Sequence, residues 1–462
     1  MNNDRFNDFD EEDRQLVLDF ENTVLRGGMQ FFDVDELEVI IDYYFEVNDM
    51  ESLQRAVEYA EQLYPDSTTV RLRRAHLLIA QEKYESALKI IKQLRRQEPD
   101  NTDVAYSLGV AYGAVGESRK AIDLFLEAAA DGWMLGRVYG NIAEEYFNLR
   151  EYDEAIRYYQ LALDTDSFDP ATLYNYLDTS IQAGRVEDAI VYLKSFVGEH
   201  PYSGDAWHCI GSAYRQLDLY EQAADAYEYA IAIDKTDYYS YLDLSSVQEA
   251  MGQTGDAVST LLRARDYTSH RADLYRDIAY IYARVDNAEM AILYFRKAVE
   301  ENPDDAELHA SLALTYSVAG DLGTALPIIK KALRMAPNNA EVLGTAALIY
   351  DAMDNFEAAS DFYERMITCE ECSELQCQRY LHFLYKHKVY EVMIDFATES
   401  LELYPQHPFY STYLVAACFR TNRYNRAAQN MPYIDPALLN EICPEIADHP
   451  RLGPLIPHHD SD

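Results

Sequence analysis

The chain has 462 residues, of which 48% are apolar and 13% aromatic, so it carries enough apolar material for a folded core. Its 80 acidic residues outnumber its 39 basic residues and give a formal net charge of -41, which disfavours binding to nucleic acid or to an anionic membrane surface. Six cysteines in so long a chain argue against a disulfide scaffold. The acidic start MNNDRFNDFDEEDR does not resemble a signal peptide. The sequence also contains no run of 18 apolar residues, the length needed to cross a membrane. We therefore expect a cytoplasmic protein.

Residues 1–33 are predicted to be an acidic N-terminal segment with a capping helix. The segment Glu11 to Arg26 carries apolar side chains at helical spacing, and Gly27 and Gly28 follow it as helix breakers. This helix falls in the register of the second helix of a preceding repeat, so it can cover the first repeat that follows.

From residue 34 onward the sequence repeats every 34 residues, without insertion or deletion. The marker is an alanine that we number position 20 of each repeat, and only Leu53 and Met393 interrupt its series. Small side chains at this position allow two helices to approach closely. The series is Ala87, Ala121, Ala155, Ala189, Ala223, Ala257, Ala291, Ala325, Ala359 and Ala427. It places the repeat starts at 34, 68, 102, 136, 170, 204, 238, 272, 306, 340, 374 and 408.

Other positions of the repeat agree with this phase. Position 8 is small in eight repeats, position 27 is alanine in seven, and position 32 is proline in six. Position 15 is Gly, Asp or Asn in nine of twelve repeats, and these residues tolerate the left-handed conformation that ends a helix. The three exceptions are Glu82, Arg150 and Lys388.

The repeat from Ala206 to Ala230 carries a recognisable motif. Trp207, Gly211 and Tyr214 match the W-x2-L-G-x2-Y pattern of the tetratricopeptide repeat, with Ile210 in place of Leu. The resemblance extends over residues 34–441, and the chain is also similar to large, acidic, uncharacterised bacterial members of that family. It implies an all-α fold: a right-handed superhelical α-solenoid of twelve 34-residue helix-turn-helix repeats with helical caps.

The solenoid is predicted to end at residue 441, and residues 442–462 are predicted to be a C-terminal cap and a loose tail. The segment Pro436 to Ala447 has apolar residues at helical spacing and is expected to form a capping helix. The last residues, from Arg451 onward, are rich in proline.

The resemblance implies that positions 2, 5, 6, 9, 12 and 13 of the first helix of each repeat line a concave wall. The first repeat then presents an acidic entrance of Asp35, Glu38, Asp42 and Glu46. The middle of the wall is our candidate groove for a partner, because Tyr and Asn offer both apolar contact and hydrogen bonds to a peptide. Alternatively, these tyrosines merely reflect the 39 Tyr of the chain. The groove residues are Tyr106, Asn141, Tyr174, Asn175, His208, Arg215, Tyr239, Arg276 and Tyr280.

The last two repeats of the wall present a basic patch, which is a candidate site for a C-terminal carboxylate or an acidic segment. Neutralisation by the chain's own carboxylates is the alternative. Family members that clamp a terminal carboxylate use Lys at position 5 and Asn at position 6 of successive repeats. Here Asn141 and Asn175 stand at position 6, but position 5 of the repeat before each is Tyr106 and Gly140 and not Lys. This argues against such a clamp in the middle of the wall. The basic patch consists of Arg379, His382, Lys386 and Arg420.

Cys369, Cys372 and Cys377 call for a test as a metal or thiol site. A closed zinc site needs four ligands, and His382 is poorly spaced to supply the fourth. The two glutamates between Cys369 and Cys372 also disfavour a thiolate. We interpret the three as ordinary turn cysteines and expect no metal and no cofactor.

Catalytic motifs such as a glycine-rich phosphate loop or HExxH are missing from the sequence, so we expect no enzyme and assign no catalytic residue. The leading hypothesis is a protein-protein interaction scaffold that binds a peptide or protein segment along the concave groove. One alternative is a structural subunit that assembles through its ends and convex face. Another is a metal or thiol site around Cys369 and Cys372.

Overall fold

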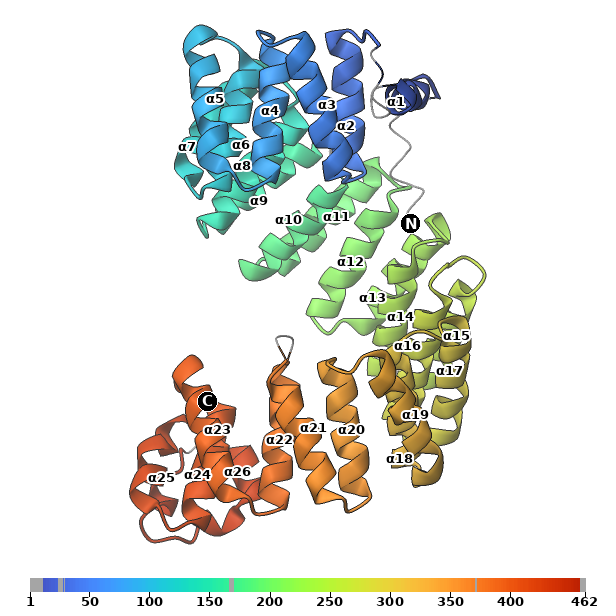
Figure 1. Cartoon of the computed structure of the whole chain (residues 1–462), viewed down its shortest axis with the longest axis vertical. Helices are drawn as coiled ribbons and strands as arrows, with labels where there is room; N and C mark the ends of the chain where they lie inside the picture. Colours follow the sequence, from blue (N-terminus) through green and yellow to red (C-terminus); the bar gives the residue numbers. More distant parts are fainter. Residues whose placement is uncertain (1–10, 24–27, 29, 166–169, 370–371, 458–462) are drawn as a thin grey trace. The chain divides into compact units, whose positions relative to one another are not determined.

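The computed structural model describes residues 11–23, 28, 30–165, 170–369 and 372–457. Among these residues every regular element is helical, so the predicted all-α class is confirmed (Figure 1). The chain divides into an N-terminal part, Met1–Gln253, and a C-terminal part, Thr254–Asp462, which are described separately. The handedness of the superhelix and the division at residues 33 and 441 stay predictions.

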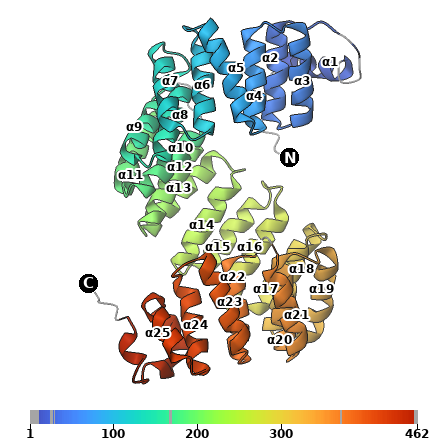
Figure 2. The same cartoon turned by 60° about the vertical axis from the view of Figure 1, so that its left-hand side comes forward.

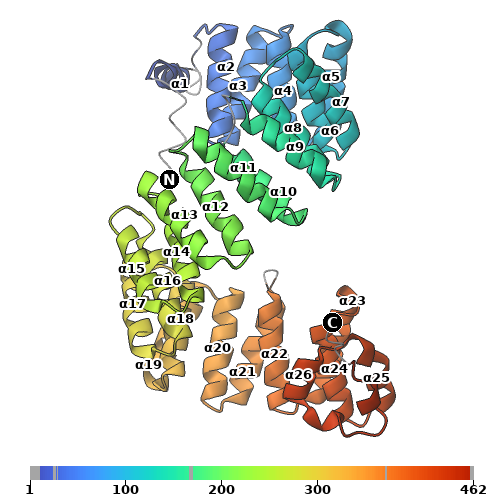
Figure 3. The ribbon, with the colours of Figure 1, turned by 180° about the vertical axis from the view of Figure 1, so that it is seen from behind.

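Within each part, consecutive helices pack against one another from α1 to α14 and from α15 to α25, and α26 packs against α24 (Figures 1, 2 and 3). The N-terminal part contains α1 (Glu11–Thr23), α2 (Val34–Glu46), α3 (Met50–Leu63), α4 (Thr68–Ala80), α5 (Tyr84–Gln97), α6 (Thr102–Ala114), α7 (Ser118–Ala130), α8 (Leu135–Asn148), α9 (Tyr152–Leu163), α10 (Ala171–Gln182), α11 (Val186–Glu199), α12 (Gly204–Gln216), α13 (Tyr220–Ile233) and α14 (Tyr238–Ala250).

The C-terminal part continues the alternation of first and second helices of each repeat. It contains α15 (Thr254–Ala264), α16 (Arg271–Arg284), α17 (Ala288–Glu301), α18 (Ala306–Val318), α19 (Leu322–Met335), α20 (Ala340–Ala352), α21 (Phe356–Ile367), α22 (Glu374–Lys386), α23 (Tyr390–Leu403), α24 (Pro408–Arg420), α25 (Tyr424–Asn430) and α26 (Pro436–Ile442), with 3-10 turns at Met431–Tyr433, Pro444–Ile446 and Gly453–Leu455.

The first helix of most repeats begins at a side-chain cap. The residue before the helix is Asp, Asn or Ser, and its side chain accepts a hydrogen bond from a backbone N–H of the first turn. Such a cap stabilises a helix by about 1 kcal/mol. The capping residues are Asp33, Ser67, Asn101, Ser203, Asp237, Asp305, Asn339 and Ser373.

Two residues after the end of the same helix, position 15 has a positive φ in all twelve repeats, between 55° and 85°. The prediction for this position is confirmed, and even the exceptions Glu82, Arg150 and Lys388 adopt φ values of 59°, 60° and 60°. In the second repeat the N–H of Lys83 donates to the carbonyl of Leu78, and that of Glu82 to Ile79. These two bonds form a Schellman motif, which turns the chain back so that the second helix packs on the first.

The small residues lie where the two helices of a repeat cross. All ten alanines of position 20 are fully buried. At position 8, Gly109 and Gly211 face the rings of Phe125 and Tyr227, and a β-carbon on Gly211 would stand 2.7 Å from a ring carbon of Tyr227. The close crossing predicted from the sequence is therefore observed.

A helix packs against the repeats at each side of the array, α1 before the first repeat and α26 in the last one. Phe20 of α1 is fully buried, and its ring centroid lies 5.7 Å from that of Phe32 and 5.9 Å from that of Tyr59. The predicted helix to Arg26 is described only as far as Thr23, since residues 24–27 lie outside the described residues.

At the C-terminal end the single helix predicted from Pro436 to Ala447 is wrong. The helix α26 stops at Ile442 and a 3-10 turn follows, because Pro444 cannot continue an α-helix. The cap is nevertheless anchored, since the Tyr385 hydroxyl donates to the carbonyl of Ile442 at 2.6 Å and Ile446 is fully buried.

The crossing at Gly211 gives a stability test. We expect Gly211→Ala to lower the free energy of unfolding by about 1–3 kcal/mol, because the new methyl group meets the fully buried Tyr227 ring. Gly140→Ala in α8 is the matched control, since no atom lies within 4 Å of its added β-carbon. That variant should gain about 0.5–1 kcal/mol from the helix preference of alanine. Urea denaturation measures both, and equal effects of the two substitutions would contradict the packing argument.

Candidate functional site

The first helices of three successive repeats, α10, α12 and α14, are joined by a polar network that contains three of the predicted groove residues. The Tyr174 hydroxyl on α10 donates to a carboxylate oxygen of Asp205 on α12 at 2.7 Å. The rings of Tyr174 and His208 lie 5.8 Å apart between centroids. We call the residues Tyr174, Asp205, His208, Arg215 and Asp243 the α10–α12–α14 network.

His208 is the centre of this network. It is buried, its Nδ1 lies 2.9 Å from the Ser240 hydroxyl, and its Nε2 lies 3.3 Å from Asp243 on α14. The same carboxylate lies 3.6 Å from Arg215. Both ring nitrogens of His208 thus have partners on α14, and these contacts hold the imidazole in one orientation.

Burial and the hydrogen bond to Asp205 raise the pKa of Tyr174 far above its ordinary value. Burial likewise raises the pKa of the adjacent Cys209 thiol. Both groups therefore stay protonated at neutral pH. They serve for hydrogen bonding and packing, whereas nucleophilic chemistry would need the ionised forms.

Several predicted groove residues in or beside the network are exposed. Tyr239 on α14 is 72% exposed and Tyr174 is 41% exposed. Asn175 and Arg215 are exposed as well. Exposed phenol, amide and guanidinium groups thus occupy wall positions of the same three repeats as the network carboxylates Asp205 and Asp243.

Tyr106 and Asn141 lie on the earlier helices α6 and α8 and bond to each other at 2.8 Å. Tyr106 is only 6% exposed, because the Trp133 ring lies 4.9 Å from it and the Phe125 ring 5.5 Å. It therefore supports the wall from within, and its ring is not offered to a partner.

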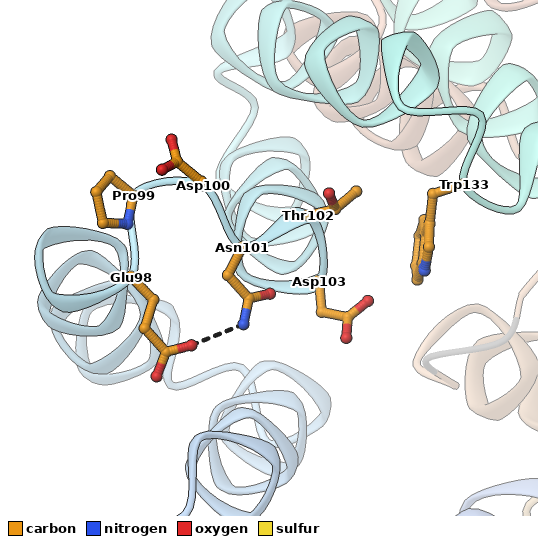
Figure 4. Close-up of a pocket in the computed structure, with 7 residues that line it drawn as sticks. All are labelled: Glu98, Pro99, Asp100, Asn101, Thr102, Asp103 and Trp133. Carbon is orange, nitrogen blue, oxygen red and sulfur yellow. Dashed lines mark hydrogen bonds between the residues drawn. The ribbon is translucent and has the colours of Figure 1, made fainter.

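A shallow depression lies beside Trp133, at the start of α6 (Figure 4). One side of it is formed by the turn before α6, where the amide of Asn101 donates to Glu98 at 2.7 Å. Thr102 donates to Asp131 at 2.7 Å. The depression is acidic and is lined by Glu98, Pro99, Asp100, Asn101, Thr102, Asp103 and Trp133.

The remaining predicted groove residues belong to the C-terminal part. Arg276 on α16 pairs with Asp273 at 2.6 Å and with Asp277 at 3.1 Å. Tyr280 shares a hydrogen bond of 3.0 Å with Ser311 on α18. The predicted groove is therefore divided between the two parts of the chain.

The predicted acidic entrance is partly neutralised by a single arginine. Arg73 on α4 pairs with Glu38 and with Asp42 of α2, the latter at 2.8 Å. Burial raises the pKa of Asp42, while Arg73 acts in the opposite direction. His76, one turn further along α4, lies 3.0 Å from the Ser107 hydroxyl of α6.

Three cations of the predicted basic patch have carboxylate partners. Arg379 lies 3.4 Å from Glu341, Lys386 lies 2.8 Å from Asp351, and Arg420 lies 3.1 Å from Glu445. His382 is exposed. An anionic ligand would have to compete with these pairs, so the contacts favour neutralisation by the chain's own acids.

The Asp351 carboxylate illustrates the strength of one such pair. Burial opposes its ionisation, but hydrogen bonds from Lys386 and His387 outweigh burial and lower its pKa.

Of the three turn cysteines, Cys369 donates to the carbonyl of Asn338 at 3.2 Å. In the part of the chain that the structure describes, no group of His, Cys, Asp and Glu is arranged to hold a metal ion.

Sequence analysis missed Asp205, a member of the network, and Ser240, which bonds to His208. Asp205 stands at position 2 of its repeat, one of the expected wall positions, so the spacing alone could have identified it. Ser240 stands at position 3, outside the wall positions, and only the structure reveals its bond to His208.

The fold and the wall define a helical-repeat protein, and comparison with known proteins gives its family. Models described as tetratricopeptide repeat match residues 49–130, 136–169, 181–238, 272–305, 294–326 and 318–368, which together span more than half of the chain. The chain belongs to the tetratricopeptide repeat family, as the resemblance predicted. Tetratricopeptide repeats form protein-protein interaction scaffolds.

Two curated relatives are similar at low identity. The chain is 24% identical over 279 residues to the TPR repeat-containing protein YpiA of Bacillus subtilis, which covers 53% of this chain and 66% of YpiA. It is 21% identical over 253 residues to the Superkiller complex protein 3 of Homo sapiens, which covers 45% of this chain and 16% of that protein. The matches thus span less than two thirds of either relative.

Among solved structures, the crystal structure of MamA is 28% identical to this chain, with a TM-score of 0.30, and covers 35% of this chain and 95% of MamA. None of the described helices combines the length and the apolar character that crossing a membrane would require.

His76 gives a pH-dependent prediction. Burial, with repulsion from Arg73 and Arg137, lowers its pKa to about 4, whereas a histidine in an unfolded chain titrates near pH 6.5. Between these values the unfolded chain takes up a proton that the folded chain does not, so stability should fall as the pH falls from about 6.5 to about 4. His76→Gln removes this titration, and its stability should vary less with pH, by up to about 1.4 kcal/mol per pH unit.

Denaturant titrations across this pH range measure the difference between wild type and His76→Gln. His382→Gln is the control, because that side chain is exposed. If His76→Gln and wild type lose stability in parallel as the pH falls, His76 is not the group responsible.

Proposed function

We propose that this chain is a non-catalytic scaffold that binds an extended segment of a partner protein across α10, α12 and α14 of the N-terminal part. The observation that carries the proposal is the α10–α12–α14 network, which ties three successive first helices together through Tyr174, His208 and Asp243. The proposal involves no metal, cofactor or covalent step.

The network favours binding because it is already ordered. Its hydrogen bonds fix the side chains before a partner arrives, so little rotamer entropy is lost on binding. Tyr174 and Tyr239 supply partly exposed rings at the two sides of the face. Tyrosine gives a large contact area at a low entropy cost, and the Asn175 amide can pair with both N–H and C=O of a peptide backbone.

The charge of the face indicates the kind of segment it would accept. The α10–α12–α14 network contains two carboxylates, Asp205 and Asp243, and one arginine, Arg215. Asp178 on α10 is also exposed and occupies a wall position of its repeat. A segment that carries lysine or arginine beside apolar residues would meet carboxylates and tyrosine rings together. The human relative is by its name a protein of the Superkiller complex, and a role in a multi-protein assembly agrees with a scaffold.

The test compares two triple variants of the whole chain. The face variant carries Asn175→Ala, Arg215→Ala and Tyr239→Ala, all exposed side chains, so the fold should be kept. The matched control removes an amide, a guanidinium group and a phenol elsewhere, with Gln222→Ala, Arg157→Ala and Tyr202→Ala. Each protein is immobilised and exposed to a cell extract, and the bound proteins are quantified by mass spectrometry.

We expect a partner that wild type and the control retain and that the face variant loses. Its binding segment, made as a peptide, should bind the face variant at least about tenfold more weakly than wild type, as expected when exposed aromatic and arginine contacts are truncated. Equal retention of every partner by the face variant and wild type would refute the assignment of the face.

A further inference from the structure

The start of α22 has a cysteine on each side of its cap. Ser373 is the cap residue: its hydroxyl accepts from the N–H of Gln376 at 3.4 Å, and the Gln376 side chain accepts from the N–H of Ser373 at 2.7 Å. In a helix with such a capping box, the residue before the cap commonly packs against the fourth residue of the helix as a hydrophobic staple. Here these two staple positions are Cys372 and Cys377.

The staple brings the two sulfur atoms together. The Sγ atoms of Cys372 and Cys377 lie 3.7 Å apart, and both thiols are free and partly buried. A disulfide needs a separation of about 2.05 Å, so the two sulfurs have to approach each other by less than about 2 Å. Cys369 is held elsewhere, by bonds of 3.2 Å and 3.5 Å to the carbonyls of Asn338 and Arg365.

We propose that Cys372 and Cys377 are a modification site, where a hydroperoxide converts the staple into an intrachain disulfide. One thiol loses its proton, its thiolate attacks the peroxide, and the O–O bond breaks to give a sulfenic acid. The hydroxide or alkoxide that leaves takes up a proton and becomes water or an alcohol. The second thiolate attacks the sulfenic sulfur, and hydroxide leaves and is protonated to water. The pair loses two protons and two electrons, and the peroxide is reduced.

The surroundings set the conditions for this step. Burial, together with the neighbouring Cys377 thiol, raises the pKa of Cys372 to about 12. Little of the Cys372 thiol is therefore ionised at neutral pH, so oxidation is slow there. Because the thiolate is the reacting species, disulfide formation should speed up as the pH rises above neutral.

The disulfide would fix the part of α22 that contacts its neighbours. Gln376 and Arg379, in the same stretch of helix, hold Glu341 of α20 at 3.1 Å and 3.4 Å. Burial, together with the neighbouring Cys377 thiol, raises the pKa of Tyr410 on α24, so these two side chains lie close together. Oxidation would therefore covalently close the first turn of a helix that links α20 to α24.

The experiment oxidises the whole protein with dilute hydrogen peroxide and counts thiols under denaturing conditions. We expect two of the six thiols to be lost, without formation of dimers, and the loss to be faster at pH 9 than at pH 7. Cleavage on the carboxyl side of Glu374 separates Cys372 from Cys377, so the two fragments should stay joined until a reductant is added. Peptide mass spectrometry reads this directly on the wild-type chain.

Cys369→Ser is the matched control and should lose two thiols as wild type does. Cys372→Ser and Cys377→Ser should each lose none to an intrachain bond, and circular dichroism checks that they are folded. A link from Cys369 to either of the other cysteines would overturn the proposal. So would retention of all six thiols in the folded wild-type protein at pH 9.

Discussion

The architecture depends on one backbone constraint, the left-handed residue that ends the first helix of each repeat. A β-carbon makes this conformation unfavourable by about 1–2 kcal/mol, yet Glu82, Arg150 and Lys388 adopt it as well. The packing that follows from the turn has to offset this cost. The turn folds the second helix back onto the first, and the alanines of position 20 then let the two helices cross closely enough to bury both apolar faces.

The same constraint determines the polar chemistry of the wall. Because each repeat places its first helix beside the next first helix, wall side chains find partners about one period away in sequence. Tyr174 and Asp205 are separated by 31 residues, and Tyr106 and Asn141 by 35. In the C-terminal part, Asp351 and Lys386 are separated by 35. Much of the hydrogen-bonding capacity of the wall is thus used between neighbouring repeats and rigidifies it.

The fold could be predicted almost completely from the sequence, since its signals are local and occur many times. Alanine at position 20 and a turn residue at position 15 each report a requirement of the backbone, and a few exceptions do not hide a period that recurs twelve times. The C-terminal cap was harder, because no repeat supports it and a single residue, Pro444, ends the predicted helix early.

The site was less predictable because it depends on departures from the repeat. Tyr106 occupies a wall position, but Trp133 stands at position 32, where six repeats have proline, and its ring covers Tyr106. Position in the repeat indicates that a side chain lies on the wall. It does not indicate whether a neighbouring loop buries that side chain, or which partner occupies its polar atoms, as Asp205 does for Tyr174.

The net charge of -41 has a different meaning once these pairs are known. Cations of the wall, such as Arg73, Lys386 and Arg420, are already bound by carboxylates of neighbouring helices. An incoming acidic group gains little there, because it must displace a partner that is held in place. A cationic group meets carboxylates that outnumber the cations around them, and its binding reduces the repulsion between these carboxylates. For the partner segment proposed above, the sign of its charge would therefore matter most, and the exposed tyrosine rings would add contact area that charge alone does not supply.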